Sequence, residues 1–140
     1  MRPRSCSAAI LLIAGTASAA PGWEVRIPDR VEVAQGASAP LPIAIAVDRG
    51  LTVSKDAPVI IDLVPEAGAV VKKRRLGRPE AVDPGADAPR FMVAVKGEAA
   101  GDHALAIRVR FWLCAAKTCR PIDMKKVAQV AVTTTTPSGP

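Results

Sequence analysis

The segment HALAIRVRFWLC, residues 103–114, alternates apolar side chains with small, polar or charged ones along most of its length. One face of this segment would carry Leu105, Ile107, Val109, Phe111 and Leu113. A repeat of two residues is that of a β-strand with one face in a core and the other toward solvent. We find no stretch with the repeat of a long amphipathic helix. The chain is therefore predicted to fold as β-structure.

Further short apolar segments recur along the chain, separated by Pro, Gly and Asp. They lie at residues 23–27, 31–34, 41–47, 59–64, 70–76, 91–95 and 122–132. About eight strands at this spacing predict a sandwich or a barrel. Pro40 and Pro42 lack an N–H group, so the strand around Ile43 is predicted to be an edge strand or to start late. Residues 78–90 contain three prolines and a Pro-Gly pair and are predicted to form a surface loop.

The chain begins with MRPRSCSAAILLIAGTASAA, in which two arginines precede an apolar run and a small-residue cleavage site. This order is typical of a secretory signal peptide. We therefore predict a signal peptide over residues 1–19, a β-sandwich over 20–133 and a disordered tail over 134–140. The predicted location is periplasmic or secreted, with no transmembrane segment in the mature chain. A retained N-terminal anchor is the alternative.

Removal of the signal peptide would lower the formal net charge from +6 to +4, leaving 17 basic against 13 acidic residues. The cluster KKRR, residues 72–75, has the composition of a nucleic-acid patch. Charged residues are also a usual protection of exposed sheet edges. A solvated strand edge is the favoured interpretation, because the run is short and the chain contains no tyrosine. We predict no nucleic-acid partner and a monomer.

Two cysteines, Cys114 and Cys119, flank the short segment AAKT. If AAKT is a hairpin loop, the two cysteines lie opposite each other and can form a disulfide. The same register sets Trp112 opposite Pro121, Arg110 opposite Asp123, Phe111 opposite Ile122 and Val109 opposite Met124. An apolar pair inside and an opposite-charge pair outside both support this register. The register next sets Ile107 against Lys126, so a bulge or the end of regular pairing is expected near Lys125 and Lys126.

The purpose of this cysteine pair is open at the level of sequence. Closing so short a loop would stabilise the fold by roughly 2 kcal/mol, less than the roughly 3 kcal/mol expected for a 15-residue loop. An exposed disulfide at this position has the properties of a bond that exchanges readily. Lys117, Arg120 and Arg110 could supply positive charge, which lowers the pKa of a thiol. Trp112 and Pro121 would then shape access to the pair.

The segment FWLCAAKTCRP, residues 111–121, resembles the active-site hairpin in the N-terminal periplasmic domain of the thiol:disulfide interchange protein DsbD. An aromatic residue precedes the first cysteine and a proline follows the second in both. The upstream LTVSKDAPVIIDL and AGDHALAIRVRF and the closing VAQVAV fall in the order of such domains. The resemblance implies an immunoglobulin-like antiparallel β-sandwich of about 7–9 strands. It also implies that the matches Cys114 and Cys119 receive electrons from a membrane domain and pass them to exported thiol proteins.

This chain departs from that family in several ways. The loop between the cysteines is one residue shorter, and neither a transmembrane module nor a thioredoxin-like module with Cys-x-x-Cys is present in the sequence. Two hypotheses therefore remain. The chain is either a thiol–disulfide exchange module whose partners are exported or membrane thiol proteins, or an exported binding or accessory domain with a structural hairpin disulfide.

Other kinds of site find little support in the sequence. Structural zinc needs four ligands, and the predicted mature chain offers two cysteines and His103. We expect no metal site and no cofactor. The sequence also lacks a recognisable set of nucleophile and base for hydrolysis. Whether the protein is an enzyme thus depends on whether the cysteine pair exchanges thiol and disulfide with other proteins.

Overall fold

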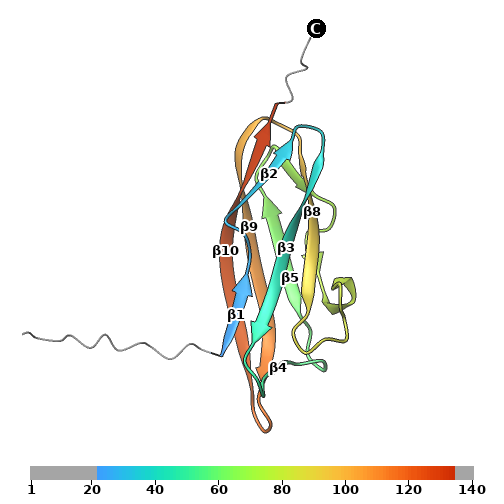
Figure 1. The fold of residues 1–140 in the computed structure, drawn as a ribbon, viewed down its shortest axis with the longest axis vertical. Helices are drawn as coiled ribbons and strands as arrows, with labels where there is room; N and C mark the ends of the chain where they lie inside the picture. The colour runs from blue at the N-terminus through green and yellow to red at the C-terminus, as the bar shows by residue number, and fades with distance from the viewer. Residues whose placement is uncertain (1–21, 135–140) are drawn as a thin grey trace, which may run out of the picture.

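The computed structural model describes residues 22–134, which form two β-sheets packed face to face (Figure 1). The predicted signal peptide over 1–19 and the predicted tail beyond Thr134 lie outside the described residues. Between residues 22 and 134, we find no helix long and apolar enough to cross a bilayer.

The first sheet is antiparallel throughout. Its order across the sheet is β1 (Trp23–Arg26), β3 (Ser38–Val47), β8 (Arg90–Gly97) and β6 (Ala69–Val71). Its inward side chains alternate with exposed ones, most regularly along β8.

The second sheet is built on the long hairpin of β9 and β10. Its order is β2 (Arg30–Ala34), β10 (Cys119–Thr133), β9 (Gly101–Cys114), β5 (Ile60–Pro65) and β7 (Arg75–Leu76). A short strand, β4 (Thr52–Val53), pairs with the end of β9. The strand β2 runs parallel to β10, the one parallel ladder between strands of the described residues and a feature that the sequence did not indicate.

This arrangement is that of an immunoglobulin-like sandwich. Constant-type immunoglobulin domains place strands A, B, E and D in one sheet and C, F and G in the other. Here β1, β3, β8 and β6 occupy the first four places, and β5, β9 and β10 occupy the other three. The described residues form ten strands, of which β4 and β7 have only two residues each. The predicted all-β, immunoglobulin-like fold is confirmed.

The segment predicted as one strand over residues 70–76 is divided between the two sheets. Residues of β6 pair with β8 in the first sheet, whereas β7 pairs with β5 in the second. Val71 and Leu76 are both buried, and the intervening KKRR cluster is exposed as the chain crosses between the sheets. The cluster is solvated, as predicted, but three of its four residues lie in the connection between strands and not on a strand edge. The prediction of a single strand is wrong.

The strand β3 lies between β1 and β8 and is not an edge strand over its whole length. However, β1 pairs only with residues 44–47 of β3, whereas β8 pairs with residues 38–44. Pro40 and Pro42 therefore lie where β3 has a neighbour on one side only. The missing N–H groups fall at the open side, which is how the strand accommodates two prolines.

The core lies between the sheets and contains the predicted inner face of β9. Leu105, Ile107, Val109, Phe111 and Leu113 each have 2% or less of their surface exposed. Phe111 also meets the ring of Trp23 edge to face, with 5.9 Å between ring centroids. The long alternating segment is thus the inner wall of the second sheet.

The ladder between β9 and β10 continues without a bulge from Cys114–Cys119 to Gly101–Val132. The expected interruption near Lys125 and Lys126 is therefore wrong. Lys126 keeps the inward register opposite Ile107, but its ammonium group leaves the core. Its Nζ donates to the Ile27 carbonyl at 2.6 Å and lies 2.8 Å from Asp29 Oδ1. A long side chain with a charged tip can satisfy both the register and its own solvation.

Two neighbouring residues of β5 provide a test of this architecture. Leu63 is fully buried, whereas Val64 is 58% exposed on the opposite face. We expect Leu63→Ala to lower the free energy of unfolding by about 2–5 kcal/mol, because it leaves a cavity in the core. Val64→Ala should change it by less than about 0.5 kcal/mol. Denaturant titration of both variants measures the difference, and similar values would contradict the assigned faces of β5.

Candidate functional site

The cysteine pair lies at the tip of the β9–β10 hairpin, at one end of the elongated domain (Figure 1). Cys114 ends β9, Cys119 begins β10, and the two are joined by a disulfide. The Ala115 N–H donates to the Thr118 carbonyl at 2.8 Å and closes the loop. Cys114 is half-buried and Cys119 is exposed. The predicted hairpin and its register from Val109 to the cysteines are confirmed.

The outer face of the hairpin carries Trp112 and Pro121, which lie opposite each other in the ladder. Trp112 is 41% exposed, although it is one of the largest apolar side chains of the domain. Both residues line a shallow groove of about 360 Å³ together with Pro58, Ile60 and the charged residues of the outer face. The hairpin therefore presents an apolar, accessible surface close to the disulfide.

Charged residues further along the outer face pair in a pattern that the sequence did not reveal. Arg110 faces Asp123 across the ladder, as predicted, yet its guanidinium binds Asp62 of β5 at 2.8 Å. Asp62 also accepts a hydrogen bond from Arg75 Nε at 2.7 Å. Asp123 is bound instead by Arg108, at 2.9 Å from Nε. Diagonal neighbours and the adjacent strand thus compete with the direct cross-strand pair.

These ion pairs lower the pKa of both carboxyl groups. Arg75, the strongest influence, and Arg110 hold the pKa of Asp62 below its ordinary value, against a smaller opposing effect of burial. Arg108 does the same to the pKa of Asp123. Because the Arg110 guanidinium is directed toward Asp62 and the residue lies four positions from Cys114, roughly 13 Å along the strand, it is not a source of charge at the cysteines. The suggestion that Arg110 assists them is therefore wrong.

Lys117 and Arg120 are the remaining cations of the predicted site. Lys117 is exposed in the hairpin loop, and Arg120 is exposed at the second position of β10. Arg120 lies opposite Leu113 in the ladder. Both residues are thus placed at the same tip as the disulfide by the hairpin itself.

A further strand beside the cysteines was missed by the sequence interpretation. Thr52 of β4 pairs with Cys114, on the side of β9 away from Cys119. The Ser54 N–H also donates to the Trp112 carbonyl at 2.8 Å. Two residues are too few to show an alternating pattern, so this strand could not be recognised before the fold was known.

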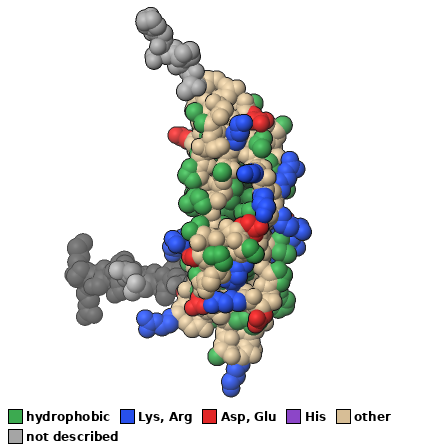
Figure 2. Space-filling view, turned by 90° about the vertical axis from the view of Figure 1, so that its right-hand side faces the viewer, with side chains coloured by type: hydrophobic (Ala, Val, Ile, Leu, Met, Phe, Trp, Pro, Cys, Tyr) green, Lys and Arg blue, Asp and Glu red, His purple; other side chains and the backbone are tan. Residues whose placement is uncertain are grey.

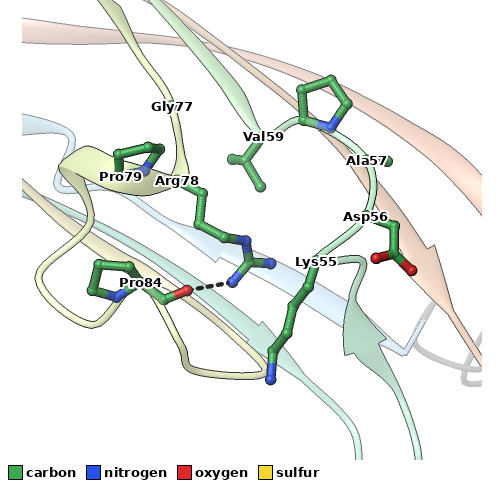
Figure 3. Close-up of a pocket in the computed structure, with 9 residues that line it drawn as sticks. Lys55, Asp56, Ala57, Val59, Gly77, Arg78, Pro79 and Pro84 are labelled. Atoms are coloured by element: carbon green, nitrogen blue, oxygen red, sulfur yellow. Dashed lines mark hydrogen bonds between the residues drawn. The ribbon is translucent and has the colours of Figure 1, made fainter.

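The loop from Gly77 to Pro89 holds β4 in place. The Val53 N–H donates to the Asp87 carbonyl at 2.8 Å. Arg78 reaches four carbonyl oxygens, at 2.9 Å for Pro84, 3.0 Å for Ala86 and Val53, and 3.1 Å for Ser54. Figure 3 shows this guanidinium at the wall of a pocket of about 690 Å³ between the loop and the chain after β4. The loop predicted at 78–90 is therefore anchored by one arginine.

His103 lies near the start of β9, at the far end of the strand from Cys114. Its Nε2 is 2.6 Å from the Ala99 carbonyl oxygen, and its ring covers Gly68, where no side chain would fit. Within residues 22–134, no group of three or more His, Cys, Asp or Glu side chains could hold a metal ion.

Comparisons with known proteins do not assign the chain to a family. No family model matches it, and neither does any curated protein. Domains 4 and 5 of the S-layer protein SbsC align with 14% identity and a TM-score of 0.45, over 78% of this chain and 44% of that one. Murine CRIg aligns with 8% identity and a TM-score of 0.46, over 79% and 98%. AggA, the major subunit of aggregative adherence fimbriae type I from Escherichia coli, aligns with 11% identity and a TM-score of 0.36, over 79% of this chain and 95% of that one. We draw no function from these similarities.

The charge cluster around Asp62 predicts a pH-dependent contribution to stability. Because the folded-state pKa lies below the ordinary value of 3.8, the ionised carboxylate stabilises the fold at higher pH. That contribution is lost as pH falls below 3.8 and through the lowered pKa. We expect Asp62→Asn to lower the free energy of unfolding at pH 7, with a difference from the unmodified protein that closes toward pH 2. Denaturant titrations across this pH range measure it.

Asp56 provides the matched control for this prediction. It is exposed and makes no ion pair within the described part of the chain. Asp56→Asn should therefore behave like the unmodified protein across the pH range. A constant Asp62→Asn difference from pH 7 to pH 2 would show that packing, and not charge, explains its effect.

The disulfide itself should contribute little to the stability of the sandwich. Both cysteines lie at the tip of a ladder that extends over the whole hairpin. We expect the Cys114→Ser, Cys119→Ser double variant to stay folded and to lose no more than about 2 kcal/mol of unfolding free energy. Circular dichroism and denaturant titration test this. Loss of the folded signal would make the bond an essential structural bridge.

Proposed function

We propose that the protein exchanges thiol and disulfide with other exported proteins through Cys114 and Cys119. The observation that supports this most is the position of the disulfide. It joins two residues that the β9–β10 ladder already holds opposite each other, and it links no distant part of the chain. A bond that adds little to the fold but is exposed to other proteins is suited to exchange.

The exchange proceeds in two successive displacements of a thiolate. A thiolate of the reduced pair attacks a disulfide of the partner, forms a mixed disulfide and releases one partner thiolate. The second cysteine, as its thiolate, then attacks the sulfur of the first and releases the other partner thiolate. The partner gains two electrons, and Cys114 and Cys119 become the disulfide. Two protons lost by the pair are taken up by the partner's thiolates through water, and a second dithiol protein reverses the steps to regenerate the reduced pair.

Features around the pair support each requirement of this chemistry. Positive charge on Lys117 and Arg120 favours the thiolate form of a neighbouring cysteine. Trp112 and Pro121 offer an apolar surface beside the pair. The resemblance to the N-terminal domain of DsbD assigns the same role to the matching cysteines. The predicted signal peptide would deliver the protein to an oxidising compartment, where the disulfide can persist.

A second candidate function is a binding or accessory domain whose hairpin disulfide only fixes the loop. The exposure of Trp112 favours it, because an exposed tryptophan in a groove is a common anchor for a partner. In that case the loop conformation matters and the redox state does not. The two functions make opposite predictions about the reduction potential.

We expect the Cys114–Cys119 pair to have a reduction potential of roughly −120 to −270 mV, the range of exchange proteins. Equilibration of the purified protein in glutathione and dithiothreitol buffers, with the reduced fraction read after alkylation, measures it. A value below about −300 mV would identify a structural bridge and favour the binding domain.

Single-cysteine variants provide the matching control. Cys114→Ser and Cys119→Ser each leave one thiol, and the variant that retains the attacking cysteine should accumulate mixed disulfides with an exported protein supplied in its disulfide form, releasing one partner thiolate. The double variant should accumulate none. Equal yields from all three variants would mean that the captured proteins bind the surface without exchange.

A further inference from the structure

The strand β8 has an open edge in the first sheet. It pairs with β3 over residues 90–96, but β6 pairs only with its last three residues, 95–97. The chain leaves the sheet after Val71 and crosses to β7 in the other sheet. The first part of β8 therefore has no neighbour on the side away from β3.

The prolines of β3 show which backbone groups face this open side. In an antiparallel ladder, residues alternate between those bonded to one neighbour and those bonded to the other. Pro40 and Pro42 cannot donate, so their partners Ala94 and Met92 direct their N–H and C=O groups away from β3. The odd-numbered residues of β8 bond to β3 instead.

Both ends of the open edge are occupied by other parts of the chain. Lys96 pairs with Val70 of β6 at one end. At the other end, the Arg90 N–H donates to Asp83 Oδ1 at 2.8 Å, and its carbonyl accepts from the Val82 N–H at 2.8 Å. Between them, the pair Val71–Val95 directs the Lys72 N–H group toward the Ala94 carbonyl. The N–H and C=O groups of Met92 and the N–H group of Ala94 have no partner from residues 22–134 on this side. Three backbone polar groups are thus available to a ligand.

A groove runs beside these groups. It has a volume of about 500 Å³ and is lined by Lys72, Lys73, Leu76, Met92, Val93 and Ala94. Three of the most exposed apolar side chains of the domain lie along the same edge: Val70 at 38%, Val82 at 62% and Met92 at 56%. The edge therefore combines free hydrogen-bonding groups with apolar surface, the two features that strand addition uses.

Charge decides which kind of partner fits. The KKRR cluster borders the groove, and Figure 2 shows lysine and arginine side chains along this side of the molecule. Lys73 is paired with Glu80 at 2.7 Å, but Lys72 and Arg74 form no ion pair within the described residues. A second copy added edge to edge would bring these cations together, which is unfavourable. An acidic segment would instead complement them.

We propose that the open edge of β8 binds an extended, acidic segment of a partner protein as an added strand. The segment pairs with the backbone of Met92 and Ala94. Its central residue, opposite Val93, turns an apolar side chain inward toward Leu76. The flanking residues turn acidic side chains outward, beside Lys72. This surface is separate from the cysteine pair, which lies in the other sheet.

The test uses the acetylated and amidated peptide Thr-Glu-Val-Glu-Thr, whose central valine matches the position opposite Val93, with the purified protein. We expect saturable binding by nuclear magnetic resonance, with the Met92 and Ala94 amide protons becoming protected from hydrogen exchange. A peptide with lysine in place of each glutamate should bind much more weakly. A peptide with N-methyl groups on the amides that face β8 should lose the protection.

Two variants of the protein complete the test. Ala94→Pro removes an N–H group that faces the gap, and it should weaken binding about fivefold to tenfold. Lys72→Glu should also weaken binding, with an effect that shrinks as salt is added. Lys125→Glu, the same change on β10, should bind as the unmodified protein does. So should the Cys114→Ser, Cys119→Ser variant, which separates this surface from the proposed exchange reaction.

Three results would overturn the proposal. The first is peptide binding without protection of Met92 and Ala94. The second is equal binding of the glutamate and lysine peptides, which would remove the role of charge. The third is protection of the two amides that rises with protein concentration in the absence of peptide, which would assign the edge to a second copy of the chain. If Ala94→Pro does not fold, the N-methyl peptide and Lys72→Glu carry the same test.

Discussion

The ladder between β9 and β10 is the constraint on which the rest of the structure depends. It joins fourteen residue pairs, from Cys114–Cys119 to Gly101–Val132, without interruption. Its inner face forms the wall of the core, while its two outer edges hold β5 and β2. The cysteine pair is the last step of this ladder. Its geometry is therefore fixed by hydrogen bonds along the hairpin, before any disulfide forms.

Where the sequence repeat was long, it predicted both the fold and the hairpin correctly. The alternation from Leu105 to Leu113 identified the buried face of β9, and the chemistry of facing residues identified the register with β10. Only one register puts Phe111 against Ile122 and the two cysteines together. Long strands are predictable because a shift by one residue would turn the whole apolar face to solvent.

The sequence failed where a residue's environment is set by distant parts of the chain. Lys126 breaks the apolar pattern of β10, yet the strand continues because Ile27 and Asp29 receive its charge. Arg110 leaves its cross-strand neighbour for Asp62, which β5 brings alongside. Arg78 joins a proline-rich loop to β4 through four carbonyl groups. Each of these contacts either joins residues that are far apart in the sequence or uses a backbone carbonyl group. A local pattern of side-chain types records neither.

The same physics explains why both proposed surfaces lie at the ends and edges of strands. A sandwich core is intolerant of polar groups, and the described residues bury none there. Reactive or unpaired groups are therefore confined to places where pairing stops. At the hairpin tip, the ladder ends in a disulfide that the core does not need. At β8, pairing stops because the chain leaves for the second sheet after Val71, and the cations that keep other sheet edges away are the ones that would attract an acidic strand.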